Sequence, residues 1–182
     1  IERPIVFGNN DAPGVVLASA AKEYLRIYGV LVGKKPIIFT NNDSAYETAI
    51  EFKNNGIDPI ILDTRTNPKS EIIAVAKNLG IDIKFSYVVV AANGYKKVNS
   101  AQIAQISPDK KDLGKIEKIN CDCICVSGFW TPTIHLASQS GNKTKFDEKI
   151  DAFVPGKSKQ NETTVGSANG IFNLEETINT SF

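Results

Sequence analysis

The sequence predicts an α/β fold, in which a parallel sheet with helices is built around one Rossmann-like βαβ unit and is continued by an antiparallel β-meander. The βαβ unit is indicated first by residues 36–40, a short run of β-forming apolar residues, and by a polar turn at 41–43. Apolar residues then recur at helical spacing until Gly56 closes the helix. A second apolar run, 59–62, ends in Asp63. Strand, turn, helix, strand and acid in this order are typical of a dinucleotide-binding unit.

The β-meander is indicated by a change in the residue pattern after residue 80, from helical spacing to strand-forming runs and a turn. Residues 85–90 favour a strand, the Ala-Asn-Gly at 92–94 is a hairpin turn signal, and 95–106 favour a second strand region. A short strand is also expected at 115–119. We therefore expect a meander in place of a further parallel crossover.

The turn of the βαβ unit lacks the glycines that a phosphate-binding turn needs. The Gly-x-Gly-x-x-Gly positions read Thr-Asn-Asn-Asp-Ser-Ala, and glycines are what let backbone N–H groups approach a pyrophosphate. Asp43 places a negative charge where the phosphate would lie, although Asp43 or Ser44 suits a helix N-cap. Asp63 lies 22 residues after Asn41, the position of a ribose-binding acid. We favour a unit that has lost its nucleotide site over one that binds through Asn41, Asn42 and Asp63.

The elements that flank this unit follow from turn and capping signals. Residues 3–7 favour a strand and 8–11 a turn, and a helix is expected from residue 13 to Tyr28. A second helix is expected from Asn67-Pro68 to Gly80. The apolar stripe of the first helix is predicted to comprise Val16, Leu17, Ala20, Ala21, Tyr24 and Ile27.

The last third of the chain carries short elements. Pro132 suits the first turn of a helix that runs to about residue 140, and 144–154 is expected to be a charged, solvated hairpin. Residues 165–170 favour a strand end followed by a glycine-bounded turn, and 171–179 a final helix.

Three cysteines, Cys121, Cys123 and Cys125, alternate along a predicted buried strand at 121–126. Alternate residues of a strand share a face, about 6–7 Å apart, so all three thiols are expected to point the same way. That spacing is too long for a disulfide and poor for a single metal ion. We favour a buried strand of reduced thiols over a metal site, which fits a reducing cytoplasm.

Composition excludes several classes of function. Of the 182 residues, 42% are hydrophobic and 23% charged, and the net charge is +1, which favours neither nucleic acid nor an anionic membrane as a partner. No apolar run approaches the ~20 residues that span a bilayer. These residues do not predict a signal peptide. The chain has no methionine and begins with Ile1, so we expect a fragment of a longer chain.

His135 is the only histidine, and its ordinary pKa would suit a general base. It lies beside Ile134 and Leu136, without a serine or cysteine constellation. We favour packing or capping over catalysis.

Four segments carry a resemblance to a known family. They are Arg-Pro-Ile-Val-Phe-Gly-Asn-Asn-Asp-Ala-Pro-Gly-Val (3–15), Phe-Thr-Asn-Asn-Asp-Ser-Ala-Tyr (39–46), Trp-Thr-Pro-Thr-Ile-His-Leu (130–136) and Gly-Ser-Ala-Asn-Gly (166–170). In this order they resemble the alpha subunits of heterotetrameric sarcosine oxidases. The βαβ unit and the meander also look like the inserted nucleotide domain of FAD/NAD(P)-binding folds of the disulfide-reductase type.

The resemblance implies a role within a larger, cytoplasmic complex. That complex demethylates sarcosine oxidatively to glycine, hydrogen peroxide and a one-carbon unit that tetrahydrofolate accepts, with FAD and FMN as flavins. The alpha subunit would bind NAD upstream of this chain and folate downstream. Residues 1–34 would flank the outer dinucleotide-binding domain, 35–126 would form the inserted domain, and 127–182 would return toward the outer domain.

The resemblance implies no catalytic residue within this chain. The expected cofactor contacts are Gly166, Ser167 and Ala168, where related flavoproteins have Gly-Asp beside the nucleotide, and Gly8 and Asn9 near the upstream site. Ser167 replaces the acid of the family pattern.

Three hypotheses of function follow. The first is a non-catalytic scaffold segment of a sarcosine oxidase alpha subunit, with the other subunits as partners. The second is a subunit of a related amine or opine oxidoreductase, because a shared fold does not fix the substrate. The third is a stand-alone NAD-binding module.

Overall fold

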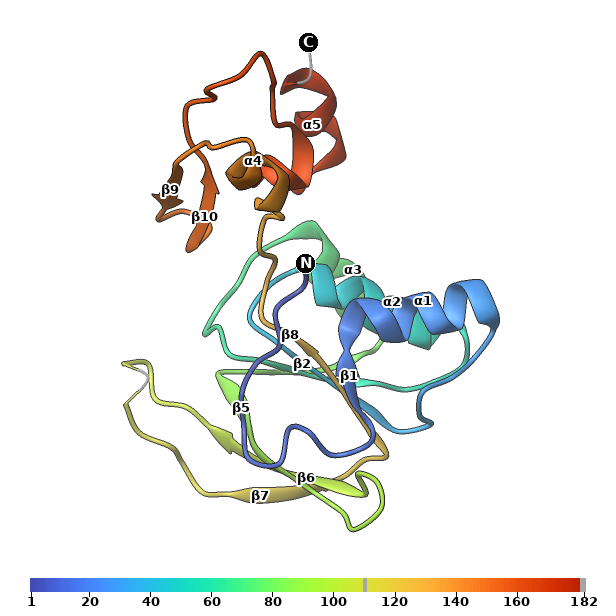
Figure 1. The fold of residues 1–182 in the computed structure, drawn as a ribbon. Coiled ribbons are helices and arrows are strands. Elements are labelled where there is room, and N and C mark those ends of the chain that lie inside the picture. Colours follow the sequence, from blue (N-terminus) through green and yellow to red (C-terminus); the bar gives the residue numbers. More distant parts are fainter. Residues whose placement is uncertain (110, 181–182) are drawn as a thin grey trace. The chain divides into compact units, whose positions relative to one another are not determined.

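The computed structural model describes residues 1–109 and 111–180, which form two compact units (Figure 1). The larger unit comprises residues 2–129, and the smaller one comprises Ile1 and the chain from Trp130 onward. No helix within the described residues combines the length and the apolar content that a membrane-spanning helix needs.

A five-stranded parallel sheet forms the centre of the larger unit. Its strands follow the order β1-β8-β2-β3-β4, and each neighbouring pair is parallel. The strands are β1 Val15–Leu17, β8 Cys123–Ser127, β2 Pro36–Thr40, β3 Ile60–Asp63 and β4 Asp82–Phe85. Every residue of β2 and β8 is buried, which explains why these strands are continuous apolar runs without alternation.

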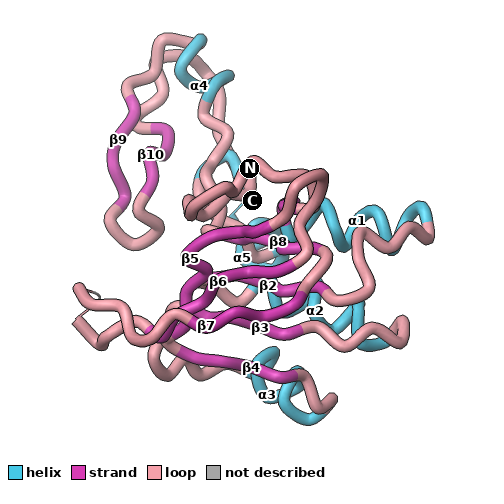
Figure 2. The backbone as a smooth tube through the Cα atoms, turned by 90° about the horizontal axis from the view of Figure 1, so that it is seen from below, coloured by secondary structure: helices cyan, strands magenta, loops and turns pink. Residues whose placement is uncertain are grey.

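Helices cover one face of this sheet and the meander covers the other (Figures 1 and 2). The helices are α1 Ala18–Tyr28, α2 Ser44–Asn54 and α3 Glu71–Asn78. The meander consists of β5 Tyr87–Asn93, β6 Ser100–Gln105 and β7 Glu117–Asn120, paired antiparallel.

Two cores result from the alternation of side chains along the central strands. On the helix side, Ile38 and Ile61 pack with Phe52 of α2. On the meander side, Phe39 packs with Phe7, their ring centroids 5.8 Å apart. The sheet is thus buried on both faces, as parallel sheets require.

The smaller unit contains short elements that agree only partly with prediction. They are α4 His135–Gln139, β9 Thr144–Asp147, β10 Ala152–Pro155, a 3₁₀ turn η1 Gly166–Asn169 and α5 Leu174–Thr180. The hairpin of β9 and β10 is confirmed, with Phe146 opposite Phe153. The glycine-bounded turn predicted within 165–170 is confirmed, because the left-handed Gly166 and Gly170 begin and cap a 3₁₀ turn. The strand end predicted before it is wrong. The predicted starts of α4 and α5 lie three residues too early.

The predicted α/β fold is confirmed, but the meander does not replace a parallel crossover. Strand β4 extends the parallel sheet, and the meander follows it. Residues 85–90 read as one strand in the sequence, whereas Ser86 has φ 57° and divides β4 from β5. A left-handed serine within an apolar run is uncommon, and the sequence gives no sign of it.

The N-terminal elements also differ from prediction. Residues 3–7 form no strand, and Gly8 makes an isolated bridge to Ala91. The helix predicted from residue 13 begins at Ala18, because Val15–Leu17 pair with β8 as an additional strand. Helix α3 likewise begins at Glu71. Strand β1 therefore belongs to the same sheet as the strands of the segment 35–126. The domain division at residues 34 and 126 stays a prediction.

The predicted apolar stripe of α1 is only partly buried. Ala18, Ala21 and Leu25 are buried against the sheet, whereas Tyr24 and Ile27 are exposed. The helix therefore carries apolar side chains on two sides.

Candidate functional site

The candidate site lies at the carboxyl ends of β2 and β8. From β2 the sheet grows in one direction through β3 to β4, and the chain then returns on the other side of β2 as β8. Open α/β sheets bind ligands where the strand order reverses in this way. Thr40 and Ser127 end the two strands as register partners at this point. The phosphates of a dinucleotide would lie here, over the turn that leads into α2.

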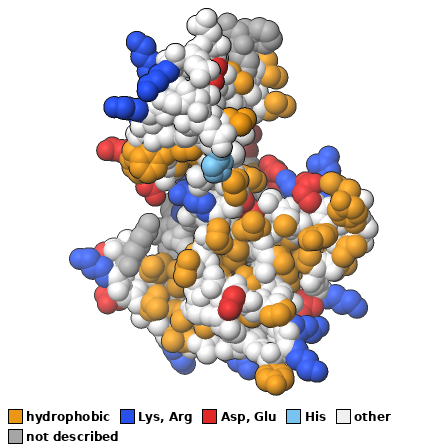
Figure 3. All heavy atoms as spheres, in the orientation of Figure 1, with side chains coloured by type: hydrophobic (Ala, Val, Ile, Leu, Met, Phe, Trp, Pro, Cys, Tyr) orange, Lys and Arg blue, Asp and Glu red, His pale blue; other side chains and the backbone are white. Residues whose placement is uncertain are grey.

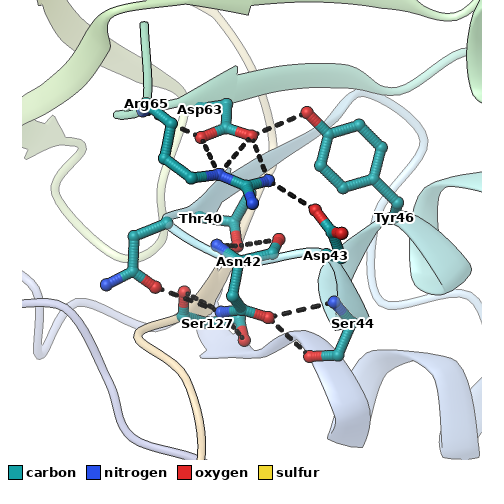
Figure 4. A network of polar contacts seen from close by, with 9 residues as sticks. Thr40, Asn42, Asp43, Ser44, Tyr46, Asp63, Arg65 and Ser127 are labelled. Carbon is teal, nitrogen blue, oxygen red and sulfur yellow. Dashed lines mark hydrogen bonds and ion pairs between the residues drawn. The ribbon is translucent and has the colours of Figure 1, made fainter. Parts of the chain in front are cut away.

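Asn42 bridges the two strand ends (Figure 4). Its Nδ2 donates to the carbonyl oxygen and to Oγ of Ser127, both at 3.1 Å. Its Oδ1 accepts from the backbone N–H of Ser44 at 3.0 Å and from the Ser44 hydroxyl at 2.6 Å. Asn42 is 5% exposed and Ser127 is fully buried. The side chain of Asn42 thus takes the space between the strands and binds the N-terminus of α2, where a phosphate would bind.

Thr40 fixes the backbone of this turn. Its hydroxyl donates to the carbonyl oxygen of Asn42 at 3.0 Å and accepts from the Asn42 backbone N–H at 3.1 Å. Thr40 is fully buried, so this local bond pair is shielded from water. The turn is therefore held by side-chain bonds in place of the glycine conformations that a nucleotide-binding turn uses.

Asp63, the predicted ribose acid, is fully buried and bonded to its own chain. It accepts from the Tyr46 hydroxyl at 2.7 Å, from the Arg65 backbone N–H at 2.9 Å and from the Arg65 guanidinium, with Nη2 at 2.7 Å. Both carboxylate oxygens are engaged, and a ribose hydroxyl would have to displace one of these partners.

Arg65 joins two carboxylates, since its Nη2 lies 2.7 Å from Asp63 and 2.7 Å from Asp43. Burial lowers the pKa of Arg65, but hydrogen bonds to Asp63 and Asp43 outweigh it and raise the pKa overall. Burial, followed by the bond to Asp63, raises the pKa of Tyr46. Tyr46 is therefore neutral, and the two acids and one guanidinium leave a net negative charge beside the N-terminus of α2. That charge disfavours a phosphate.

The N-terminus of helix α1, which also lies beside β8, is likewise occupied by a side chain of this protein. Helix α1 has no side-chain cap at Leu17. Instead, the Glu2 carboxylate accepts from the Ser19 backbone N–H at 3.0 Å and from the Ser19 hydroxyl at 2.6 Å. Glu2 is 5% exposed, so this carboxylate takes the anion position of α1.

The structure brings some of the predicted site residues together. Asn42 and Asp63 lie in one polar network, and Asn41, which is exposed, joins it through its Oδ1, 3.1 Å from Asn42 Nδ2. Sequence reasoning missed Arg65 and Ser127, which complete this network. The signals were weak: Arg65 follows Asp63 by two residues, and Ser127 is the last residue of an apolar strand.

Gly8 and Asn9 lie elsewhere, against strand β5. The Gly8 N–H donates to the Val90 carbonyl oxygen at 2.9 Å, and Asn9 donates from its side chain to the Ala92 carbonyl oxygen at 3.2 Å. A Cβ at Gly8 would lie 3.1 Å from Ala91 Cβ, so glycine permits this close approach. Both residues are exposed, and their predicted cofactor contact stays a prediction.

Gly166, Ser167 and Ala168 form the 3₁₀ turn η1 of the smaller unit. Gly166 is buried with φ 63°, and a Cβ there would lie 3.0 Å from Thr177 Cγ2. Ser167 is exposed and Ala168 partly buried. The turn conformation therefore accounts for the glycine, and a cofactor contact by these residues stays a prediction.

His135 is exposed at the start of α4, so the expected packing of this side chain is wrong. The N-cap of α4 is Ile134. Among the described residues, no group of three or more histidine, cysteine or acidic side chains is arranged to hold a metal ion.

The three cysteines are buried and free, but they do not share one face. Cys123 and Cys125 lie in the core on the helix side, with their Sγ atoms 3.6 Å apart, whereas Cys121 precedes β8 and lies in the core on the meander side. The prediction of three thiols on one face is thus wrong, because the strand begins two residues later than expected.

We expect the native protein to resist thiol reagents at pH 8 and to lose stability above pH 9. Burial, followed by repulsion from Cys123 and Asp122, raises the pKa of Cys121 from 9.0 to about 12. The thiol is therefore protonated when folded, while the unfolded chain ionises near pH 9. The protonated Cys121 thiol therefore contributes fully to the free energy of unfolding below pH 9, and this contribution is lost as the pH rises toward 12.

The measurement is thiol labelling with and without denaturant, together with urea unfolding from pH 8 to pH 10. A Cys121→Ala variant should show a smaller loss of stability over this range. Fast labelling of native protein at pH 8 would contradict the assignment.

Comparison with solved structures identifies the fold class. The chain is similar to the HOCl-induced flavoprotein disulfide reductase of Escherichia coli, with a TM-score of 0.66 and 14% identity over 96% of this chain and 38% of that chain. It is similar to the thioredoxin reductase of T. acidophilum, with a TM-score of 0.64 and 12% identity over 93% and 58%. The fold is the FAD/NAD(P)-binding fold of the disulfide-reductase type, with a parallel sheet, helices and a β-meander.

The sequence relatives of this chain are alpha subunits of sarcosine oxidases. The chain is 35% identical to the sarcosine oxidase subunit alpha of Corynebacterium sp. (strain P-1) over 98% of its length, and 34% identical to that of Rhizobium meliloti (strain 1021) over 92%. It spans 18% and 16% of the length of these relatives. No protein-family model matches the chain. Over nearly its whole length, the chain is therefore similar to one segment of sarcosine oxidase alpha subunits.

Proposed function

We propose that this chain is the inserted nucleotide-fold segment of the alpha subunit of a sarcosine oxidase complex, in which it serves as a scaffold. The similarity to sarcosine oxidase alpha subunits over nearly the whole chain carries this proposal. The complex would demethylate sarcosine oxidatively to glycine, hydrogen peroxide and a one-carbon unit. The chain itself would contribute no catalytic residue.

The scaffold role is supported by the residues at the strand ends. A dinucleotide does not fit the turn after β2, because Asn42 fills the space between β2 and β8 and Asp63 is bonded to Tyr46 and Arg65. No step of the reaction is therefore assigned to this turn. The same bonds join the turn after β2 to the end of β8, and helix α2 to β3, which supports a role of this network in stabilising the sheet.

The cofactors and partners of the complex would contact the protein outside this turn. NAD would bind to the alpha subunit upstream of the chain, FAD and FMN would be the flavins of the complex, and tetrahydrofolate would accept the one-carbon unit downstream. Partners would be the other subunits of a cytoplasmic heterotetramer. The candidate contacts toward these cofactors are Gly8 and Asn9, together with Gly166, Ser167 and Ala168 of the turn η1.

The test is oxidation of sarcosine by the purified protein that contains this chain, measured as hydrogen peroxide formed with and without tetrahydrofolate. We expect sarcosine to give a higher kcat/KM than other secondary amines or opines. A preference for an opine or for a different secondary amine would contradict the proposed substrate and support a related oxidoreductase.

A further inference from the structure

Helix α1 presents an apolar surface that the larger unit leaves exposed. One side of the helix packs on the sheet through Ala18, Ala21 and Leu25. The other side and the following loop expose large apolar side chains, which Figure 3 shows gathered over α1. These side chains, which we call the α1 patch, are Tyr24 (49% exposed), Ile27 (62%), Tyr28 (69%), Val30 (50%) and Leu31 (39%).

The α1 patch contains a shallow groove of about 540 Å³. Tyr24 and Tyr28 lie one turn apart, with ring centroids 6.3 Å apart, and the small side chain of Ala20 also lines the groove. Glu23 lines the same groove and supplies a negative charge. Among the described residues, no ion pair involves Glu23.

A helix that is apolar on two sides requires two partners. Helix α3, which covers the same sheet face, exposes only Val75 among its large apolar residues. Tyrosine is enriched where proteins bind one another, since its ring buries a large apolar area while its hydroxyl finds a polar partner. The α1 patch therefore has the composition of a contact surface.

Its size indicates which kind of partner fits. An interface between separate chains engages about 20–30 residues a side, far more than the side chains of the α1 patch. A segment on the same polypeptide needs less area, because the covalent link raises its effective concentration. The chain spans only 18% of the length of its relative from Corynebacterium, so most of such a polypeptide lies outside it.

We propose that the α1 patch is a docking surface for a helix of the same polypeptide that lies outside these 182 residues. This inference rests on the proposed function, because it requires the longer alpha subunit. The helix would insert apolar side chains at i, i+3 or i+4 spacing between Tyr24 and Tyr28 and would present a lysine or arginine to Glu23. The contact would bury the second apolar side of α1.

The experiment places a photo-crosslinking benzoylphenylalanine at Tyr28 in the intact protein and identifies the crosslinked peptide by mass spectrometry. Tyr95, which is 97% exposed in a hairpin, is the matched control position. We expect about tenfold more crosslink at Tyr28 than at Tyr95, since only a packed side chain stays within about 4 Å of its neighbour. The product should join two peptides of one polypeptide.

Two results would overturn the inference. One is a yield at Tyr28 no higher than at Tyr95, and the other is a crosslink to another subunit or to a second copy, which mixing isotope-labelled with unlabelled protein would reveal. Failure of the proposed function is read separately, from the absence of sarcosine oxidation. If the crosslink joins two peptides of one polypeptide but the protein oxidises a different amine, the docking surface is supported and the proposed substrate is contradicted.

Discussion

Replacement of Arg65 by alanine lowers the free energy of unfolding by about 3 kcal/mol, which we expect to be the largest effect of any single substitution in the polar network. The guanidinium is the only cation that contacts the fully buried Asp63 within the described residues, and it also binds Asp43. Its loss leaves a buried carboxylate with only Tyr46 and a backbone N–H as donors. Those two bonds remain, so the cost lies at the low end of the range for a broken buried pair.

Urea unfolding, followed by circular dichroism, measures this loss. Lys22→Ala is the matched control, because Lys22 pairs with the exposed Glu47 at 2.6 Å, and a surface pair contributes about 0–1 kcal/mol. Arg65→Lys should recover little, since an ammonium does not reproduce the two-pronged contact. Equal effects of Arg65→Ala and Lys22→Ala would show that the buried pair does not stabilise the fold.

The second large effect is expected for Asn42→Ala, which should lower the free energy of unfolding by about 2 kcal/mol. The substitution removes two donated bonds to Ser127 and two accepted bonds from Ser44. The buried Ser127 carbonyl oxygen loses its side-chain donor, and α2 loses the oxygen that binds its first turn.

Asn41→Ala is the control for this variant, because Asn41 is exposed and shares only one bond with the network. It should change the free energy of unfolding by less than about 0.5 kcal/mol. If both asparagine variants unfold at the same urea concentration, Asn42 does not connect the strand ends as the structure indicates.

The sequence predicts the central part of this fold because periodicity and turn chemistry act locally there. Strand β2 was predicted with its observed bounds, 36–40, and Gly56 does follow the end of α2 in a left-handed conformation. Strand β4 was missed because one left-handed residue, Ser86, divides what reads as a single strand.

The polar network was only half visible in the sequence. The absence of glycines in the turn predicts that the nucleotide site is lost, but it does not predict the polar network that the structure has there. The bridge from Asn42 to Ser127 joins residues 85 positions apart, and no local pattern encodes such a pairing. The two sides of α1 show the same limit: Tyr24 and Ile27 fit an apolar stripe by spacing, whereas only the packing shows which stripe the sheet buries.

We propose that the βαβ unit of residues 36–63 has kept its architecture and filled its nucleotide site with its own side chains. Calorimetric titration of this chain with NAD and NADP measures whether the site still binds. We expect no heat of binding at millimolar nucleotide, for the native chain and for an Asp63→Ala variant alike. Clear binding that disappears in Asp63→Ala would contradict it, because Asp63 would then bind a ribose and the turn would be a working, glycine-free dinucleotide site.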